Sequence, residues 1–125
     1  MNYKTSVVIL FFNFFIVASC SQNENKKLII GNWQAVSWTS QGTPTTYDPA
    51  LTSFGFDDQG AYSFQYDTNL EEGKYFVSNN QLFTTPDGGM KMMVKIVKLT
   101  SDSLVFNMNR GGTGEQITLV RNPVY

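Results

Sequence analysis

The residue types that most often carry chemistry in proteins are scarce in this chain. Its 125 residues include no histidine and one cysteine, Cys20. A zinc site built on histidine and cysteine, a histidine-dependent triad and an internal disulfide are therefore all excluded within this sequence. The formal net charge is -1, with no excess of basic residues, so we expect no nucleic-acid partner.

Two pairs of adjacent carboxylates remain as acid–base candidates: Asp57 with Asp58, and Glu71 with Glu72. Both fall in predicted turns, where solvated charge is the usual role. A hydrolase needs carboxylates that converge across a cleft, whereas adjacent strand residues point to opposite faces. Gly-x-Ser-x-Gly and phosphate-loop motifs are missing as well. We therefore expect a protein that is not an enzyme and takes no cofactor.

Methionine sulfur is the other group that could hold a metal, because thioethers suit copper(I). Met90 and Met92 share a strand face with Val94 on a period of two. That pattern is typical of core filling by a flexible side chain. No metal site is predicted.

The chain begins with a segment that predicts export. Met1–Lys4 carries one positive charge, and Ser6–Val17 is almost wholly apolar but shorter than the ~20 residues that span a bilayer as a helix. Residues 1–19 are therefore interpreted as a signal peptide.

Val17-Ala18-Ser19-Cys20 resembles the lipobox of bacterial lipoproteins. The resemblance implies that Cys20 becomes the lipidated first residue, carrying acyl chains such as palmitate that anchor it in a membrane. Polar residues 20–27 then form a flexible tether. Ser21 is not the Asp that retains enterobacterial lipoproteins in the inner membrane, so the analogy favours the outer membrane and leaves the periplasmic or surface face open.

Alternating apolar and polar residues predict eight short strands and no long helix. Connections between them are short, apart from Ser40–Ala50, and short connections favour an up-and-down barrel over a Greek key. Residues 28–125 are thus expected to form an all-β, eight-stranded antiparallel barrel. The predicted strands are Asn32–Thr39, Leu51–Phe56, Ala61–Asp67, Gly73–Val77, Gln81–Thr85, Met90–Leu99, Leu104–Arg110 and Glu115–Arg121.

Gly31-x-Trp33 resembles the signature of the lipocalins, in which an Arg of the last strand lies across the Trp indole. The resemblance implies that Arg121 pairs with Trp33 and closes the barrel floor. The whole stretch Leu28–Arg121, with the approximate hairpin element Phe56–Tyr62, is similar to small lipocalin-like domains of Gram-negative lipoproteins, which have a calycin-type barrel.

Such a barrel is just wide enough to be filled by side chains or to hold one small ligand. Two functions follow: a membrane-anchored module that binds a small apolar ligand in the cell envelope, or a solid barrel whose outer face, including Trp38, contacts another envelope protein. The candidate ligand-binding residues of the interior are Ala35, Ser37, Tyr62, Phe64, Tyr66, Met92 and Phe106.

Overall fold

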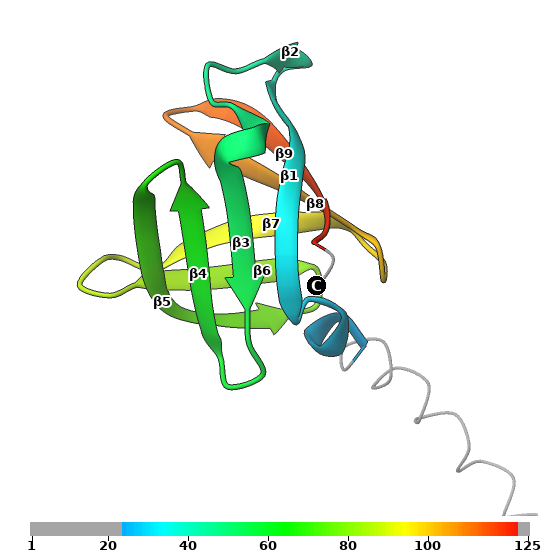
Figure 1. Cartoon of the computed structure of the whole chain (residues 1–125), viewed down its shortest axis with the longest axis vertical. Coiled ribbons are helices and arrows are strands. Elements are labelled where there is room, and N and C mark those ends of the chain that lie inside the picture. The colour runs from blue at the N-terminus through cyan, green and yellow to red at the C-terminus, as the bar shows by residue number, and fades with distance from the viewer. Residues whose placement is uncertain (1–23, 123–125) are drawn as a thin grey trace, which may run out of the picture.

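The predicted alternation is realised as strands in a computed structural model, which describes residues 24–122 (Figure 1). The predicted signal peptide and Cys20 lie outside the described residues. The strands are β1 (Gly31–Ser40), β2 (Thr43–Pro44), β3 (Thr52–Phe56), β4 (Ala61–Tyr66), β5 (Asn69–Ser78), β6 (Gln81–Pro86), β7 (Met92–Leu99), β8 (Ser103–Arg110) and β9 (Thr113–Arg121). A 3₁₀ turn, Pro49–Leu51, precedes β3.

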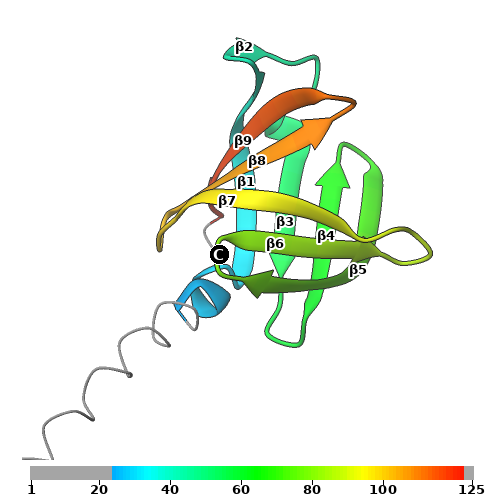
Figure 2. The ribbon, with the colours of Figure 1, turned by 180° about the vertical axis from the view of Figure 1, so that it is seen from behind.

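Consecutive strands pair antiparallel from β3 to β9, and β1 pairs with both β3 and β9. The last pairing closes the sheet into a barrel, which Figures 1 and 2 show from opposite sides. The short β2 pairs only with the end of β1 and extends beyond the wall. The predicted eight-stranded, up-and-down antiparallel barrel is therefore confirmed.

The core consists of inward-facing side chains from β1 and β3–β9 together with Ile29. These buried residues are Ile29, Trp33, Ala35, Trp38, Phe56, Tyr62, Val77, Leu82, Ile96, Leu104, Phe106, Ile117 and Leu119. A chain that begins at residue 21 contains all of them. We therefore expect it to fold without the leader.

One end of the barrel is closed by Trp33 and Arg121. Trp33 is fully buried, and its Nε1 donates to the carbonyl oxygen of Ile29 at 2.9 Å. The guanidinium carbon of Arg121 lies 4.2 Å from the centroid of the indole. Arg121 also donates to the carbonyl oxygens of Leu28, Ile30 and Ser101 at 2.6, 2.7 and 2.7 Å. The pairing implied by the lipocalin resemblance is thus present, and it ties the last strand to the chain entering the first.

Residues 24–28, which the sequence places mainly in a flexible tether, are helical. The helix packs beside the closed end, where the side-chain amide nitrogen of Asn25 donates to the carbonyl oxygen of Asn79 at 3.0 Å (Figure 1). The following Ile29 has no exposed surface. Residues 24–28 therefore pack with the barrel. Within residues 24–122, no helix has the length and apolarity that crossing a membrane requires.

Three strand predictions are wrong in detail. The strand predicted from Met90 begins at Met92, and Met90, interpreted as filling the core, is 84% exposed. The predicted turn at residues 68–72 is shorter in the structure: Asp67, with a φ of 55°, and Thr68 turn the chain, and β5 begins at Asn69. In β1, regular alternation would put Ser37 inside and Trp38 outside. A β-bulge between Ala35 and Ser37 adds one residue, so Trp38 pairs with Ile117 and is buried.

Candidate functional site

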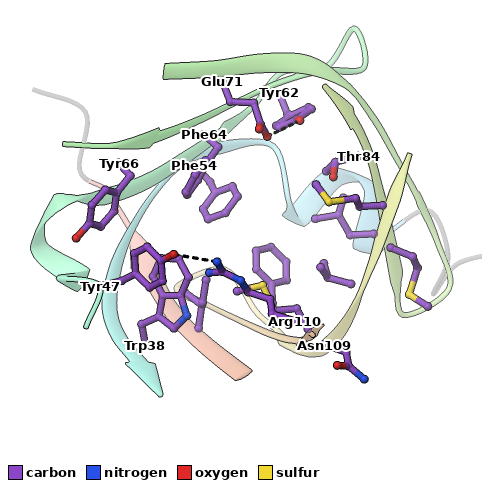
Figure 3. A pocket seen from close by; sticks show the side chains of 17 residues that line it. Trp38, Tyr47, Phe54, Tyr62, Phe64, Tyr66, Glu71, Thr84, Asn109 and Arg110 are labelled. Carbon is purple, nitrogen blue, oxygen red and sulfur yellow. Dashed lines mark hydrogen bonds between the residues drawn. The ribbon is translucent and has the colours of Figure 1, made fainter. Parts of the chain in front are cut away.

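The end of the barrel away from Trp33 is hollow. A cavity of about 640 Å³ lies between the strands there, and its walls are mainly aromatic and aliphatic (Figure 3). Its lining residues are Trp38, Tyr47, Phe54, Tyr62, Phe64, Tyr66, Glu71, Leu82, Thr84, Met92, Met93, Val94, Phe106, Met108, Asn109, Arg110 and Ile117. The volume falls within the ~300–1,000 Å³ that is usual for small-molecule sites.

Three aromatic side chains pack together on one side of this cavity. Trp38 of β1 stacks on Tyr47, with ring centroids 4.4 Å apart and planes inclined by 13°. Tyr66 of β4 meets both rings edge-on, at centroid distances of 6.5 Å from Trp38 and 5.4 Å from Tyr47. Its hydroxyl oxygen accepts a hydrogen bond from the backbone N–H of Asp48 at 3.0 Å. These contacts fix the loop after β2 against the barrel wall.

Arg110, at the end of β8, reaches toward this aromatic group (Figure 3). Its Nη2 donates to the Tyr47 hydroxyl at 2.9 Å, and its Nη1 lies 3.8 Å from Oε1 of Glu115. The hydrogen bond to Tyr47 raises the pKa of Arg110, so the guanidinium stays charged. Glu115 Oε1 also accepts from the indole Nε1 of Trp38 at 2.6 Å. The positive charge at this side is therefore matched by a carboxylate.

A second polar group lies across the cavity, where Glu71 of β5 meets Tyr62 of β4 (Figure 3). The Tyr62 hydroxyl donates to Oε2 of Glu71 at 2.8 Å. Burial first, and then the hydrogen bond and the charge of Glu71, raise the pKa of Tyr62 well above its usual range. Hydrogen bonding with Thr84 acts in the opposite direction. Tyr62 thus remains a neutral donor over the whole physiological range.

The residues of the two acidic pairs considered as catalytic candidates have separate structural positions and contacts. Asp57 Oδ1 accepts the backbone N–H groups of Gln59 and Ala61, at 2.9 and 2.8 Å, and so holds the β3–β4 turn. Glu71 faces the cavity, whereas Glu72 is exposed on the outer face. Neither pair acts as a unit. Within residues 24–122, no group of three or more acidic or cysteine side chains is placed to hold a metal ion.

Five of the seven interior residues predicted as ligand contacts line the cavity: Tyr62, Phe64, Tyr66, Met92 and Phe106. The other two, Ala35 and Ser37, do not line it. Ala35 is buried lower in the barrel, and the bulge in β1 turns Ser37 away from the interior face. Trp38 occupies the wall that was assigned to Ser37, so the prediction of Trp38 on the outer surface is wrong.

Sequence reasoning missed the polar lining residues Glu71 and Arg110. Arg110 continues the inward alternation of Phe106 and Met108, and that spacing could have placed it at the cavity. Glu71 pairs with Phe64 across β4 and β5, but the segment around it has no apolar alternation to reveal a strand. Tyr47 lies on a loop, so no strand alternation could have placed it at the cavity.

A model of the lipocalin-like domain family matches residues 29–106. The chain belongs to the lipocalin-like domain family. Among curated proteins, none matches. This lipocalin-like domain is similar in fold to an uncharacterized protein of Bacteroides eggerthii (TM-score 0.58, 14% identity, covering 75% of this chain and 99% of the other). A lipocalin-like protein of Bacteroides uniformis is comparably similar (TM-score 0.55, 20% identity, covering 76% and 98%).

Proposed function

We propose that this lipocalin-like domain binds one small, largely apolar molecule in the cavity at its open end. The observation that carries the proposal is the cavity itself, about 640 Å³ with mainly aromatic and aliphatic walls. Empty apolar space in a barrel this small loses packing contacts, whereas a bound apolar molecule would restore them. This cavity argues against the fully packed barrel on which the alternative function is based.

The setting we propose is the bacterial cell envelope. The lipobox-like Val17–Cys20 supports export and lipid attachment at Cys20, and Ser21 supports the outer membrane by the enterobacterial analogy. An envelope location would put the cavity near lipids and other poorly soluble molecules. We further propose a binding protein without catalytic activity, because the cavity hydroxyl that donates to a carboxylate, that of Tyr62, has a raised pKa and is therefore a poor nucleophile.

Lipid attachment predicts a simple labelling result. The protein expressed in its own host should incorporate radioactive palmitate, and Cys20→Ser should abolish the label while leaving the polypeptide detectable by immunoblot. Label that persists in the Cys20→Ser protein would contradict attachment at this residue. This experiment tests lipid attachment alone and does not bear on ligand binding.

Ligand binding is tested on the chain lacking residues 1–20. N-phenylnaphthylamine, an uncharged probe whose fluorescence rises in apolar surroundings, should bind saturably with a stoichiometry of one. Native mass spectrometry of the protein purified from its host should show a small molecule that leaves on collisional activation. A protein that shows neither probe binding nor a co-purifying molecule would overturn the proposal.

A second candidate function, contact with another envelope protein, is favoured by an apolar patch on the outer face. Phe76 and Phe83 stack there at 4.6 Å between centroids, and Met93, which also borders the cavity, pairs with Phe83. Phe76 and Met93 are each 49% exposed, while the Nζ of Lys91 lies 5.2 Å from the Phe76 centroid. A photocrosslinker at position 76 should capture one defined partner in cells that a crosslinker at position 72 does not. No difference between the positions would remove this candidate.

A further inference from the structure

We propose that the molecule taken by the cavity carries a protonated amine, and that Glu71 is the group that binds it. The inference rests on the proposed function, because it names the chemistry of a ligand for the same cavity. The ligand is then an amphiphile with an apolar body and a cationic head. The argument depends on the position, the hydrogen bonding and the charge of Glu71.

The strand register directs Glu71 into the cavity. Glu71 of β5 pairs with Phe64 of β4, and paired residues of neighbouring strands point to the same face. Phe64 lines the cavity, and Glu71 lines it too. Glu72, the next residue, points to the opposite face and is exposed. One of the two adjacent carboxylates thus faces an apolar cavity and the other faces solvent.

Tyr62 fixes the Glu71 carboxylate without neutralising it. Its hydroxyl donates to Oε2 at 2.8 Å, and Tyr62 itself is only 4% exposed, so the donor is held firmly by the core. Among the described residues, Oε1 of Glu71 accepts no side-chain or backbone hydrogen bond. The carboxylate is therefore preorganised, with one oxygen held and the other available to a ligand.

The charges at the cavity are unbalanced. Arg110 is the basic residue of its lining, and it already contacts Glu115 and Tyr47 on the other side. Within residues 24–122, Glu71 forms no ion pair. A carboxylate beside apolar walls favours a cationic partner, because desolvation penalises a charge that has none. An ammonium group, with three donors and no acceptor, meets that need.

The same arrangement disfavours an acidic ligand at this position. A fatty-acid carboxylate near Glu71 would place two like charges in apolar surroundings, and neither could donate to the other. An acid bound at Arg110 instead would share that guanidinium with Glu115 and would leave Glu71 without a cationic partner. The cavity thus combines an attractive element for amines with a repulsive element against carboxylates.

The test compares three probes of equal chain length, octylamine, octanol and octanoate, in displacing N-phenylnaphthylamine from the chain lacking residues 1–20 at neutral pH. We expect octylamine to displace the reporter at a concentration about tenfold lower than octanol, and octanoate to be the weakest. Glu71→Gln should remove the advantage of octylamine over octanol, with each displacement measured relative to the affinity of that variant for the reporter. Glu72→Gln removes the same charge from the outer face and should leave all three probes unaffected.

The outcomes separate this inference from the proposed function. Reporter binding without any preference for octylamine would overturn the inference and leave a hydrophobic binding protein. An amine preference that survives in Glu71→Gln, or that falls equally in Glu72→Gln, would also overturn it, since the effect would then be general electrostatic attraction. Tighter binding of octanoate, lost in Arg110→Gln, would assign the polar head to the opposite side. Failure of the reporter to bind the unaltered protein would overturn both proposals.

Discussion

At the level of single residues, Gly31 shows why a lipocalin-like barrel begins with glycine two positions before tryptophan. Its φ of +134° lies in a region that residues with a side chain rarely adopt. A Cβ built at Gly31 would also overlap Nη1 of Arg121, the nitrogen that donates to the carbonyl oxygen of Ile30. The glycine is therefore needed so that Arg121 can cross the chain and cover Trp33.

Gly31→Ala should destabilise the domain by about 1–3 kcal/mol, because the backbone is strained and Arg121 must move. The measurement is urea-induced unfolding of the chain lacking residues 1–20, followed by tryptophan fluorescence. Gly114→Ala is the matched control, since an added Cβ there meets no atom within 4 Å and the backbone is not left-handed. Equal effects of the two substitutions would contradict the role assigned to Gly31.

The buried Tyr62 and the partly buried Tyr75 predict a loss of stability in alkali. Burial, followed by the influence of Glu71, raises the pKa of Tyr62, and burial followed by Asp57 and Asp58 raises that of Tyr75. The folded protein then keeps protons that the unfolded chain releases above about pH 10, so stability falls as pH rises beyond that value. Below it, these groups cause no pH dependence.

Urea unfolding at about pH 9 and about pH 11 checks this, with a decrease of at most about 1 kcal/mol per pH unit for each tyrosine. Tyr62→Phe should show a shallower decrease than the unaltered protein, although it starts less stable because the hydrogen bond to Glu71 is lost. An unchanged slope in Tyr62→Phe would mean that another group causes the alkaline loss.

At the level of secondary-structure elements, β1 and β5 show where sequence patterns stop being sufficient. In β4, Tyr62, Phe64 and Tyr66 alternate regularly, and the predicted strand and its inward face agree with the structure. The start of β5 was not predicted, because its inward positions Asn69 and Glu71 are polar where they approach the open end. A strand that lines a polar part of a cavity lacks the alternation that marks strands.

The bulge in β1 could not be predicted either, and the reason differs from that for β5. Trp33 and Trp38 are five positions apart, so a regular strand would send them to opposite faces. Both are buried, because Val36 is accommodated as an extra residue, 54% exposed, opposite β9. Whether a strand bulges depends on its partners across the sheet, Leu119 and Thr118 here, and this information is not local in sequence.

The two tryptophans of β1 should therefore differ in their contribution to stability. Trp33→Ala removes a fully buried ring from the packed floor, where it contacts Arg121, and should cost about 3–5 kcal/mol. Trp38→Ala removes a ring that already borders a cavity, so it should cost less and should mainly weaken probe binding. Urea unfolding and N-phenylnaphthylamine titration of both variants check this. A nearly neutral Trp33→Ala would mean that Trp33 does not hold the floor.

At the level of the whole molecule, the barrel is divided into a packed end and a hollow end. The packed end joins Ile29, Trp33 and Leu119 with Arg121 above the indole. It was predictable in outline because the family resemblance names two of these residues, Trp33 and Arg121. The hollow end depends on how side chains from eight strands and one loop fill a shared volume. Sequence alone therefore left a filled core and a cavity as alternatives, and placed five cavity residues without the polar groups that distinguish the site.

This division predicts that the cavity can be obstructed without harm to the fold. Val94, on β7, lines the cavity and pairs with Leu82, which lines it too, so Val94→Trp would project its indole into the cavity. Added apolar contacts should leave stability unchanged or slightly raised, whereas affinity for N-phenylnaphthylamine should fall about tenfold or more. Thermal unfolding and probe titration measure the two effects on the same sample.

Val97→Trp is the control for this substitution, because Val97 also lies on β7 but is 49% exposed on the outside. It adds the same side chain to the same strand without reaching the cavity, so binding of the probe should persist. If Val94→Trp binds the probe as well as Val97→Trp does, the probe lies outside the barrel and the cavity is not the binding site. If Val94→Trp unfolds instead, that end of the barrel is packed too tightly to admit a ligand, and the proposed function fails with it.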